Sequence, residues 1–258
     1  MEKRKIAIIT GASSGFGKEF VKLLAEDKAI DEIWAVARNE ERLSELATEF
    51  GSKIRTYSVD LSDREEVKEF GAIVDNADVD IAYLINNAGY GKFCSYEDLD
   101  ADESLNMIDL NIGAVVALGL LCIPHMEKGS HIINIASQAA FQPLPYLNIY
   151  SATKVFVRNY SRALNVELKD KGITVTAVCP GWMKTGFYNR ANIGAAKGIT
   201  HFTAIRTPDK VAKKALRDAK KGKDVSVSGV YARLEHTVVK ILPQRIVMKL
   251  WVWLQRIK

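Results

Sequence analysis

Cysteine and histidine are scarce in this chain of 258 residues. The three cysteines, Cys94, Cys122 and Cys179, lie far apart without a CxxC pair, and the four histidines show no HExxH or paired spacing. An odd number of separated thiols is typical of free cysteines in a reducing compartment. We therefore expect no zinc site and no other metal.

Long apolar runs are also missing. No stretch of about 18 uncharged apolar residues occurs, so we predict no transmembrane helix. The apolar part of Met1–Thr10 is too short for a signal peptide. The default expectation is a cytoplasmic protein.

The charge is nearly balanced, with 36 basic and 31 acidic residues and a net charge of +5. No arginine-rich tract accompanies this mild excess, so we expect no nucleic acid partner. A phosphorylated cofactor or another small acidic molecule suits the charge better. With 48% hydrophobic residues, the chain can bury a good core.

Short apolar runs alternate with longer amphipathic stretches over most of the chain. Runs of strand length, rich in Ile and Val, lie at Lys5–Thr10, Glu32–Arg38, Lys53–Asp60, Ile81–Ala88, His131–Ser137 and Thr174–Cys179. Helical patterns between them include Phe16–Lys28, Glu40–Phe50, Asp102–Lys128 and Tyr146–Lys171. Strands buried on both faces and joined by helices form right-handed βαβ units. The sequence therefore predicts an α/β fold: a Rossmann-type doubly wound parallel sheet of about seven strands with helices on both faces.

The C-terminal part departs from this alternation. Residues 182–206 are irregular, and we interpret them as a substrate-side loop or lid. A helix is expected to begin with Pro208 at its first position, followed by a last strand near Val225–Val230. Residues 231–258 form an amphipathic C-terminal extension. No linker, repeat or low-complexity tract is present, so residues 1–258 are expected to form a single domain.

A glycine-rich turn follows the first strand and reads Thr10-Gly11-Ala12-Ser13-Ser14-Gly15-Phe16-Gly17. Gly11 allows the tight turn, Gly15 lets the backbone approach a pyrophosphate, and Gly17 lets the next helix pack closely on the sheet. The N–H groups at the helix N-terminus favour an anion. Such a turn alone is also typical of ordinary loops, but its position after the first strand favours a dinucleotide. We therefore predict a cofactor loop that includes Ser13, Ser14 and Phe16.

The residues after the second and third strands bear on the choice of cofactor. An acidic residue after the second strand would bond the ribose hydroxyls of NAD, whereas a 2′-phosphate favours a cation. Ala37 is neutral here, and Arg38 carries a fork of donors suited to phosphate. The pattern predicts NADP, with an ordinary solvated arginine as the alternative. Asp60 is a candidate partner of the adenine amino group, or a simple cap of the third strand.

Tyr150 and Lys154 are a candidate catalytic pair. They are four residues apart at the start of a helical pattern and share one face. A nearby ammonium lowers the pKa of a tyrosine, so the pair could exchange a proton with a substrate oxygen. Such spacing is also typical of ordinary helix surfaces. Ser137 favours the catalytic interpretation, because it ends the fifth strand at the edge where ligands of open sheets bind.

With these motifs in this order, the sequence resembles the short-chain dehydrogenase/reductase family, in its compact single-domain branch. The resemblance covers about Lys5–Thr185. It rests on Thr10–Gly17, Asp60-Leu61, Asn86-Asn87-Ala88-Gly89, Asn111, Ser137, Tyr150 with Lys154, and Pro180-Gly181 followed by Thr185. Phe16 departs from the family pattern, in which a smaller aliphatic residue is usual.

The resemblance implies a role for each of these residues. Tyr150 would be the general acid/base, Lys154 would lower its pKa and bond the nicotinamide ribose, and Ser137 would position the substrate oxygen. Asn111 would hold a water that links Lys154 to solvent. Arg38 in place of an acid matches the NADP-preferring pattern of the family. Further cofactor contacts would come from Leu61, Asn87, Ala88, Gly89, Pro180, Gly181 and Thr185.

The substrate is less constrained than the cofactor. Large apolar residues suggest a roomy pocket for a steroid, a lipid-like ketone or an acyl chain; they are Phe93, Phe141, Leu144, Tyr146, Trp182, Met183, Phe187, Tyr188 and Phe202. The leading interpretation is an NADP(H)-dependent oxidoreductase that interconverts a secondary alcohol and a ketone. The alternatives are a nucleotide-sugar epimerase, whose chains are longer, and a catalytically silent NADPH-binding regulator or membrane-surface adaptor.

The end of the chain, Gln244–Lys258, carries a stripe at helical spacing. Its apolar members are Ile246, Leu250, Trp253 and Ile257, widened by Val247, Trp251 and Leu254, and its basic residues are Arg245, Lys249 and Arg256. Such a stripe is typical of core or oligomer contacts. We expect it to shield the substrate pocket or to pack on a second subunit of a homodimer or homotetramer. A basic amphipathic helix with tryptophans can also lie in a membrane interface, which is the less favoured interpretation.

Overall fold

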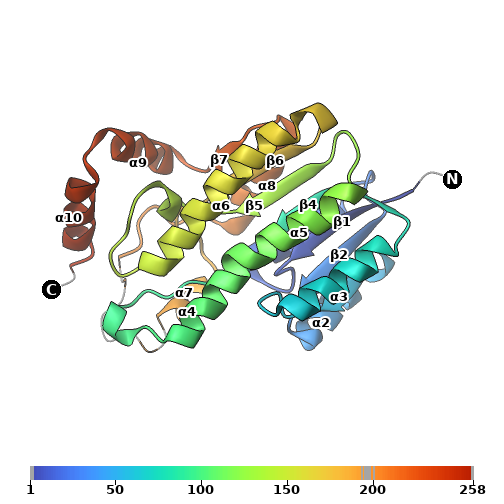
Figure 1. Ribbon diagram of the computed structural model, residues 1–258, viewed down its shortest axis with the longest axis horizontal. Helices are drawn as coiled ribbons and strands as arrows, with labels where there is room; N and C mark the ends of the chain where they lie inside the picture. The colour runs from blue at the N-terminus through green and yellow to red at the C-terminus, as the bar shows by residue number, and fades with distance from the viewer. Residues whose placement is uncertain (1–2, 193, 195–198, 200, 257–258) are drawn as a thin grey trace.

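Seven strands pair in parallel to form one sheet in the computed structural model, which describes residues 3–192, 194, 199 and 201–256. The strands are β1 (Arg4–Thr10), β2 (Glu32–Ala37), β3 (Ile54–Ser58), β4 (Val79–Asn86), β5 (His131–Ile135), β6 (Thr174–Cys179) and β7 (Val225–Val227). Their order across the sheet is β3-β2-β1-β4-β5-β6-β7 (Figure 1). The predicted doubly wound parallel sheet is confirmed.

The sheet is wound in two directions from its centre. The chain steps outward from β1 to β2 and β3, returns to β4 on the other side of β1, and continues to β7. The loops that leave β1 and β4 therefore diverge and open a crevice at the carboxyl ends of the strands. This winding brings the predicted motifs to one edge of the sheet, although the chain separates them widely.

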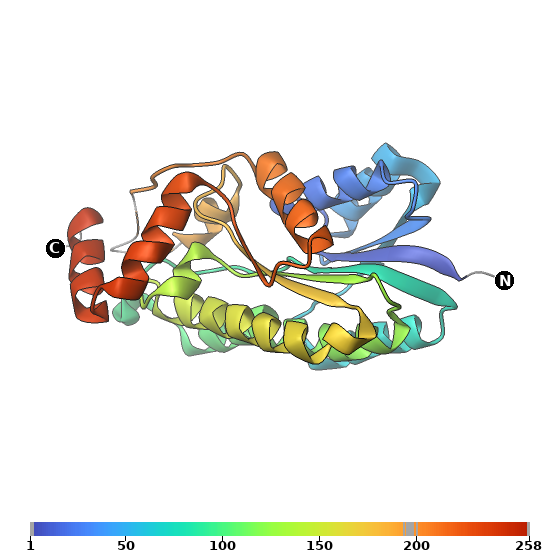
Figure 2. The same ribbon diagram turned by 90° about the horizontal axis from the view of Figure 1, so that it is seen from above.

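Helices cover both faces of the sheet, as Figure 2 shows. One face carries α1 (Gly15–Ala25), α2 (Glu40–Phe50) and α8 (Pro208–Lys220). The other carries α3 (Arg64–Asp75), α4 (Ala101–Ile108), α5 (Ala114–Cys122) and α6 (Asn148–Glu167). Two separate hydrophobic clusters result, and the strands between them read as continuous Ile and Val runs because both of their faces are buried.

The predicted helix Asp102–Lys128 is one helical stretch, Ala101–His125, with a π-helical turn at Asp109–Gly113 between α4 and α5. By length and composition alone this stretch could cross a membrane, but a buried core helix passes the same test, so the expectation of no transmembrane helix stays a prediction. It packs on α3 and β4, and 44% of its most apolar window is buried, as in the core helix of an α/β fold.

Helix α6 begins two residues later than the predicted helix Tyr146–Lys171. Tyr146 has a φ of 67°, a left-handed conformation that an α-helix cannot contain. The helical pattern ends through a short 3-10 turn at Gly172, whose φ of 68° is that of the expected cap glycine. Tyr150 therefore lies in the first turn of α6.

The C-terminal region is more helical than predicted. A short helix, α7 (Phe187–Ala191), lies within residues 182–206. The last strand stops at Val227, because Gly229, with a φ of 109°, turns the chain into helix α9 (Val230–Ile241). A further helix, α10 (Gln244–Leu254), follows.

Helices α9 and α10 lie at one end of the molecule, opposite the N-terminus (Figures 1 and 2). Each contributes one buried residue, Ala232 in α9 and Val247 in α10. The expected apolar stripe of the tail is therefore not a core contact as a whole: Ile246 and Trp253 are exposed, whereas Val247 and the half-buried Trp251 face the body. Ile257 lies outside the described residues.

Candidate active site

A cavity of about 1550 Å³ lies along the carboxyl edge of the sheet. It begins at the turn after β1 and ends against α9 and α10. Most of the predicted site residues line it: Gly11, Ser13, Ser14, Gly15, Phe16, Arg38, Leu61, Asn87, Ala88, Gly89, Ser137, Tyr150, Lys154, Pro180, Gly181 and Thr185. One continuous space therefore connects the predicted cofactor loop with the predicted catalytic residues.

Three predicted site residues do not line the cavity. A Cβ on Gly17 would lie 2.1 Å from the carbonyl oxygen of Gly11, so Gly17 lets α1 pack on the turn itself rather than on the sheet. Asp60 is held by neighbouring side chains, and Asn111 is fully buried behind the cavity wall. Asp60 is partly exposed beside Arg38, whereas a contact of the buried Asn111 with a ligand requires a rearrangement or a water.

The turn after β1 is held by hydrogen bonds to the residues that follow β4. The Thr10 hydroxyl accepts from the backbone N–H groups of Asn87 and Ala88, each at 2.9 Å. The Asn87 amide donates to the Thr10 carbonyl at 2.9 Å. Gly11, with a φ of 62°, makes the left-handed turn that its glycine predicted. The loop is therefore fixed before any ligand binds.

The N-terminus of α1 faces open space above this loop. Helix α1 has no acidic residue in its first turn, and Ser14 makes no side-chain cap. A Cβ on Gly15 would meet only the Thr185 side chain, at 3.8 Å. The unpaired N–H groups of a helix start attract an anion, so these residues fit a pyrophosphate.

Two arginines border the cavity at the end near the glycine-rich loop. Arg38 is half exposed, and its guanidinium lies 3.5 Å from the carboxylate of Asp60. Arg42 also lines the cavity, one helical turn further on in α2. Arg42 was not predicted from the sequence, although its spacing from Arg38 and the N-cap at Asn39 were available signals. Together the two cations suit a phosphate in this place.

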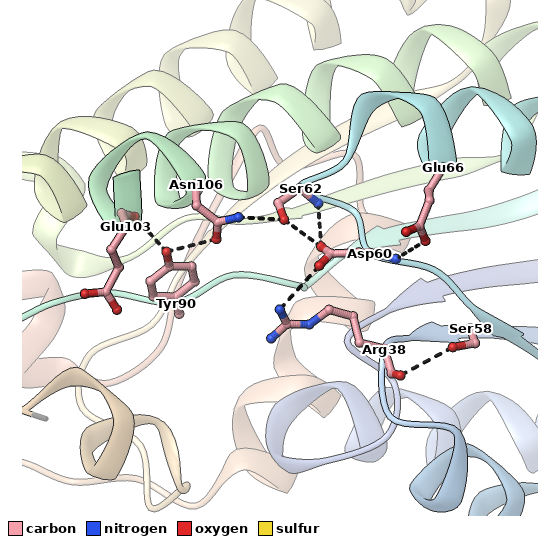
Figure 3. Close-up of polar contacts among 8 residues, drawn as sticks. All are labelled: Arg38, Ser58, Asp60, Ser62, Glu66, Tyr90, Glu103 and Asn106. Carbon is pink, nitrogen blue, oxygen red and sulfur yellow. Dashed lines mark hydrogen bonds and ion pairs between the residues drawn. The ribbon is translucent and has the colours of Figure 1, made fainter. Parts of the chain in front are cut away.

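A chain of polar contacts leads from this end toward the centre of the site (Figure 3). Asp60 accepts hydrogen bonds from the Ser62 hydroxyl at 2.6 Å, and the Asn106 amide donates to Ser62 at 2.8 Å. The Asn106 carbonyl oxygen lies 3.0 Å from the Tyr90 hydroxyl. The contacts therefore connect Asp60 to Tyr90 through α4.

The Asn111 side chain makes two hydrogen bonds with the backbone of Tyr90, one as acceptor and one as donor. Its Oδ1 accepts from the Tyr90 N–H at 3.1 Å, and its Nδ2 donates to the Tyr90 carbonyl at 2.9 Å and to the Thr153 hydroxyl at 3.1 Å. The π-helical turn places Asn111 toward α6, and such turns often mark functional sites. A Cβ on Gly89 would lie 2.7 Å from Asn111 Oδ1 and 3.4 Å from Lys154 Nζ, so only glycine allows this approach.

Tyr150 and Lys154 lie on the inner face of α6, and both are more than nine-tenths buried. The Lys154 ammonium donates to the Ile135 carbonyl at 2.9 Å and lies 5.7 Å from the centre of the Tyr150 ring. Ser137 follows β5 and makes a hydrogen bond with Tyr150 that lowers its pKa. The structure thus brings the three predicted catalytic side chains together.

Burial dominates the pKa values of this pair in the chain alone. It raises the pKa of Tyr150 to about 12, although the hydrogen bond with Ser137 opposes the shift. It lowers the pKa of Lys154 to about 8. In the chain alone the pKa of Tyr150 is therefore raised, because burial disfavours the phenolate, and the lowering of this pKa by Lys154 stays a prediction.

The family model for short chain dehydrogenase matches residues 5–196. The chain belongs to this family. An uncharacterized oxidoreductase of Staphylococcus aureus is 31% identical over 232 residues, which are 89% of this chain and 96% of the relative. An uncharacterized oxidoreductase of Staphylococcus epidermidis is 32% identical over 201 residues, which are 76% of this chain and 86% of the relative. The protein is therefore an oxidoreductase of the short-chain dehydrogenase family.

Solved structures agree with this assignment. A short-chain dehydrogenase from Sphingobium yanoikuyae in complex with NADPH superposes with a TM-score of 0.77 at 27% identity, covering 93% of this chain and 97% of that chain. A 3-ketoacyl-(acyl-carrier-protein) reductase from Brucella melitensis complexed with NADH gives a TM-score of 0.73 at 26% identity, covering 87% of this chain and 96% of that chain. Both are similar over nearly their whole length.

The substrate side of this short-chain dehydrogenase is lined by several of the predicted apolar residues: Phe93, Leu144, Trp182, Met183, Phe187 and Tyr188. Three others are not part of the lining. Phe141 stacks on His236 at 3.8 Å, and Phe202 packs on Trp182 and Tyr188. Tyr146 lies in the turn before α6. Of these three, Phe202 supports two lining residues from behind.

Sequence reasoning missed a polar group on this side. Glu235 of α9 accepts a hydrogen bond from the Gln138 amide and lies 3.5 Å from that of Gln142. Burial raises the pKa of the Glu235 carboxyl. All three residues line the cavity near Ser137. No local signal could have found this group, because Glu235 is 97 residues from Gln138.

Proposed function

We propose that the protein is an NADP(H)-dependent oxidoreductase that interconverts a secondary alcohol and a ketone on a bulky apolar substrate. One observation carries this proposal. Tyr150, Ser137 and Lys154 meet in a cavity that continues directly from the glycine-rich loop, so a cofactor and a substrate can share one space.

The bound nicotinamide would supply or accept the hydride. The α1 N-terminus and Gly15 would hold the pyrophosphate, and the residues after β4 and β6 would border the two riboses and the carboxamide. One of the similar structures holds NADPH and another holds NADH, so they do not select a cofactor. Arg38 and Arg42 support NADP, because they offer two cations to a 2′-phosphate.

The chain's own residues would manage the proton. In the reducing direction, Tyr150 donates its hydroxyl proton to the substrate oxygen while the hydride adds to the carbonyl carbon, which completes the alcohol. Ser137 donates a hydrogen bond to the same oxygen and positions it. Lys154, fixed by the Ile135 carbonyl, stabilises the tyrosinate that remains. The reverse sequence oxidises the alcohol.

The wall of the substrate side supports a bulky apolar molecule. Aromatic rings from three separate segments face the cavity around Tyr150, including Phe93 and Phe187, whose centres lie 6.0 and 5.7 Å from that of Tyr150. Such rings favour hydrocarbon by burying apolar surface. The Gln138–Glu235 pair offers one polar contact within this wall.

A substrate screen tests the proposal. Oxidation of NADPH and reduction of NADP would be measured against steroids, acyl ketones and small carbonyls, with Tyr150→Phe as the inactive reference. We expect turnover with bulky apolar ketones and its loss in the variant. Binding of NADPH without turnover of any compound would instead favour a silent regulator.

The assembly state and the cellular location are separate proposals. We infer a homodimer or homotetramer that acts in the cytoplasm on a small molecule. Light scattering of the purified protein measures the mass directly, and a monomer would contradict the first of these.

A further inference from the structure

Helices α9 and α10 expose an unusual amount of apolar surface. Nine large hydrophobic side chains on them are between 45% and 78% exposed, among them Tyr231. We call the other eight the tail face: Val230, Leu234, Val238, Ile241, Ile246, Leu250, Trp253 and Leu254. The four in each helix follow helical spacing and share one side. Each helix therefore presents an apolar stripe to its surroundings.

The opposite sides of the two helices attach them to the body. In α10, the Trp251 indole N–H donates to the Pro145 carbonyl at 3.0 Å, and Gln255 exchanges two hydrogen bonds with the backbone of His201, each at 3.2 Å. In α9, Glu235 contacts Gln138. These contacts hold the inner sides in place, so the tail face stays outward.

A row of cations runs beside each stripe. Arg233 and Lys240 are seven residues apart in α9, and Arg245 and Lys249 are four apart in α10, followed by Arg256; all five are exposed. The only acidic residue in the stretch 230–256 is Glu235, which is half-buried and bonded to Gln138. The outer surface of the tail therefore carries positive charge without a compensating acid.

We propose that the tail face docks on the surface of an anionic lipid bilayer. An apolar stripe with tryptophan, flanked by lysine and arginine, is the pattern by which helices lie in a membrane interface. A second copy of this chain fits less well, because a symmetric contact would bring two rows of unpaired cations together. An anionic surface instead satisfies both the charge and the apolar area.

The cavity reaches the surface at this face. Val238, Leu250, Trp253 and Leu254 belong both to the tail face and to the cavity lining. An apolar substrate dissolved in the bilayer could therefore reach the site without crossing water. This consequence rests on the proposed function, whereas docking itself does not.

Sedimentation with vesicles tests the docking independently of turnover. The full chain would be spun with vesicles of phosphatidylcholine alone and of phosphatidylcholine mixed with phosphatidylglycerol. We expect binding mainly to the anionic vesicles. It should fall when salt rises from about 0.1 M to about 1 M, because the Debye length shrinks from about 10 to about 3 Å.

Two paired variants separate the contributions of charge and apolar area. Arg245→Gln with Lys249→Gln should lower the partition coefficient about 30-fold, since each cation near an anionic surface contributes roughly a factor of five. Lys169→Gln with Lys171→Gln removes the same charge from exposed positions in the 3-10 turn after α6 and should change the partition coefficient little. Ile241→Ser with Ile246→Ser should lower the partition coefficient at least about tenfold, whereas Val166→Ser, at an exposed position of α6, should not.

The mass of the particles in solution, measured for wild type and variants, distinguishes a lipid bilayer from a second copy of the chain as the partner of the tail face. If the tail face binds a second copy, Ile241→Ser with Ile246→Ser should reduce the mass measured by light scattering, and the wild type should not sediment with vesicles. That result would overturn the proposal. Equal binding to neutral and anionic vesicles would also overturn the proposal. So would an equal fall of the partition coefficient in the Arg245→Gln/Lys249→Gln and Lys169→Gln/Lys171→Gln variants.

Discussion

The two walls of the cavity are built in different ways. The cofactor wall consists of turns that leave neighbouring strands, and the Thr10 hydroxyl alone fixes two backbone N–H groups of the next motif. The substrate wall combines aromatic side chains from the segments after β4 and β6 with α9 and α10, two helices that each bury a single residue and depend on contacts such as Trp251 to Pro145. Backbone geometry therefore fixes the shape of the cofactor wall, whereas contacts between side chains far apart in the sequence fix the shape of the substrate wall.

This difference predicts that substitutions affect the two walls unequally. A strand-end turn is specified by a few glycines and holds any ligand with the same phosphates. A docked helix with little buried surface can be exchanged or shifted at small cost in stability. The catalytic residues lie on α6, between the two walls, and the strongest tests of the comparison begin there.

Tyr150→Phe is expected to have the largest effect. It should lower kcat about 100- to 10,000-fold and leave the Kd of NADPH nearly unchanged, because the hydroxyl is needed for proton transfer and not for the cofactor wall. Stopped-flow turnover and fluorescence titration measure the two quantities. Tyr160→Phe is the matched control on the same helix, since no partner for the Tyr160 hydroxyl was found among the described residues. Turnover of Tyr150→Phe within a few-fold of wild type would refute the mechanism.

Lys154→Met tests how much the buried ammonium of Lys154, which lies between the two walls, lowers the free energy of unfolding. The folded pKa of Lys154 is about 8 and its ordinary value is 10.5. The folded state therefore loses the proton at lower pH than the unfolded state, and the wild type gains stability as pH rises from about 8 to about 10.5. Between pH 6.5 and 10, the free energy of unfolding of the wild type should increase by roughly 2 kcal/mol relative to the variant. Urea unfolding at pH 6.5 and at pH 10 measures the free energy of unfolding of both proteins. If the difference between wild type and variant is the same at both pH values, the burial argument is contradicted.

Arg38→Ala tests the cofactor wall alone. It should remove most of the preference for NADPH, roughly tenfold to a hundredfold in Kd, because a charge-assisted bond to a phosphate contributes about 1.5–3 kcal/mol. NADH binding and the KM for the ketone should stay the same. Arg64→Ala, at an exposed arginine that pairs with Asp109, is the control. Equal affinity of the wild type for NADPH and NADH would refute the assignment.

Trp251→Phe tests the substrate wall and should have the smallest effect. It removes one hydrogen bond to Pro145, worth about 1 kcal/mol, and loosens α10. The KM for a bulky ketone should rise several-fold, while the Kd of NADPH stays the same. A change in the Kd of NADPH instead would show that the two walls are not independent.

The accuracy of the sequence-based predictions follows the same division. Gly11, Gly15, Ser137 and Tyr150 were predicted because their positions relative to a strand or helix are local features. Asn111 and Asp60 were also predicted, but the side chains that they contact, such as Thr153 for Asn111 and Arg38 for Asp60, could not be predicted, because these partners lie elsewhere in the chain. Glu235 was missed because its partner Gln138 is 97 residues away, whereas Arg42 was missed although local signals for it were present.

The tail shows this limit most clearly. Helical spacing predicted the amphipathic helix from Gln244, but not that its inner side would hold Pro145 and His201 while its apolar outer side stays exposed. Hydrophobic periodicity predicts that a helix has an apolar and a polar side. It does not predict what each side contacts, because those contacts depend on surfaces formed by segments far away in the sequence.

The sequence by itself determined the parallel α/β fold, the cofactor loop and the Tyr150–Lys154 pair, because alternation of apolar runs and spacing within one turn or helix are local physics. Only the tertiary structure decided the path from Asp60 to Tyr90, the Glu235–Gln138 contact and the mouth of the cavity at α10. Each of these joins segments whose separation in the chain carries no periodic signal, so it exists only once the sheet has folded.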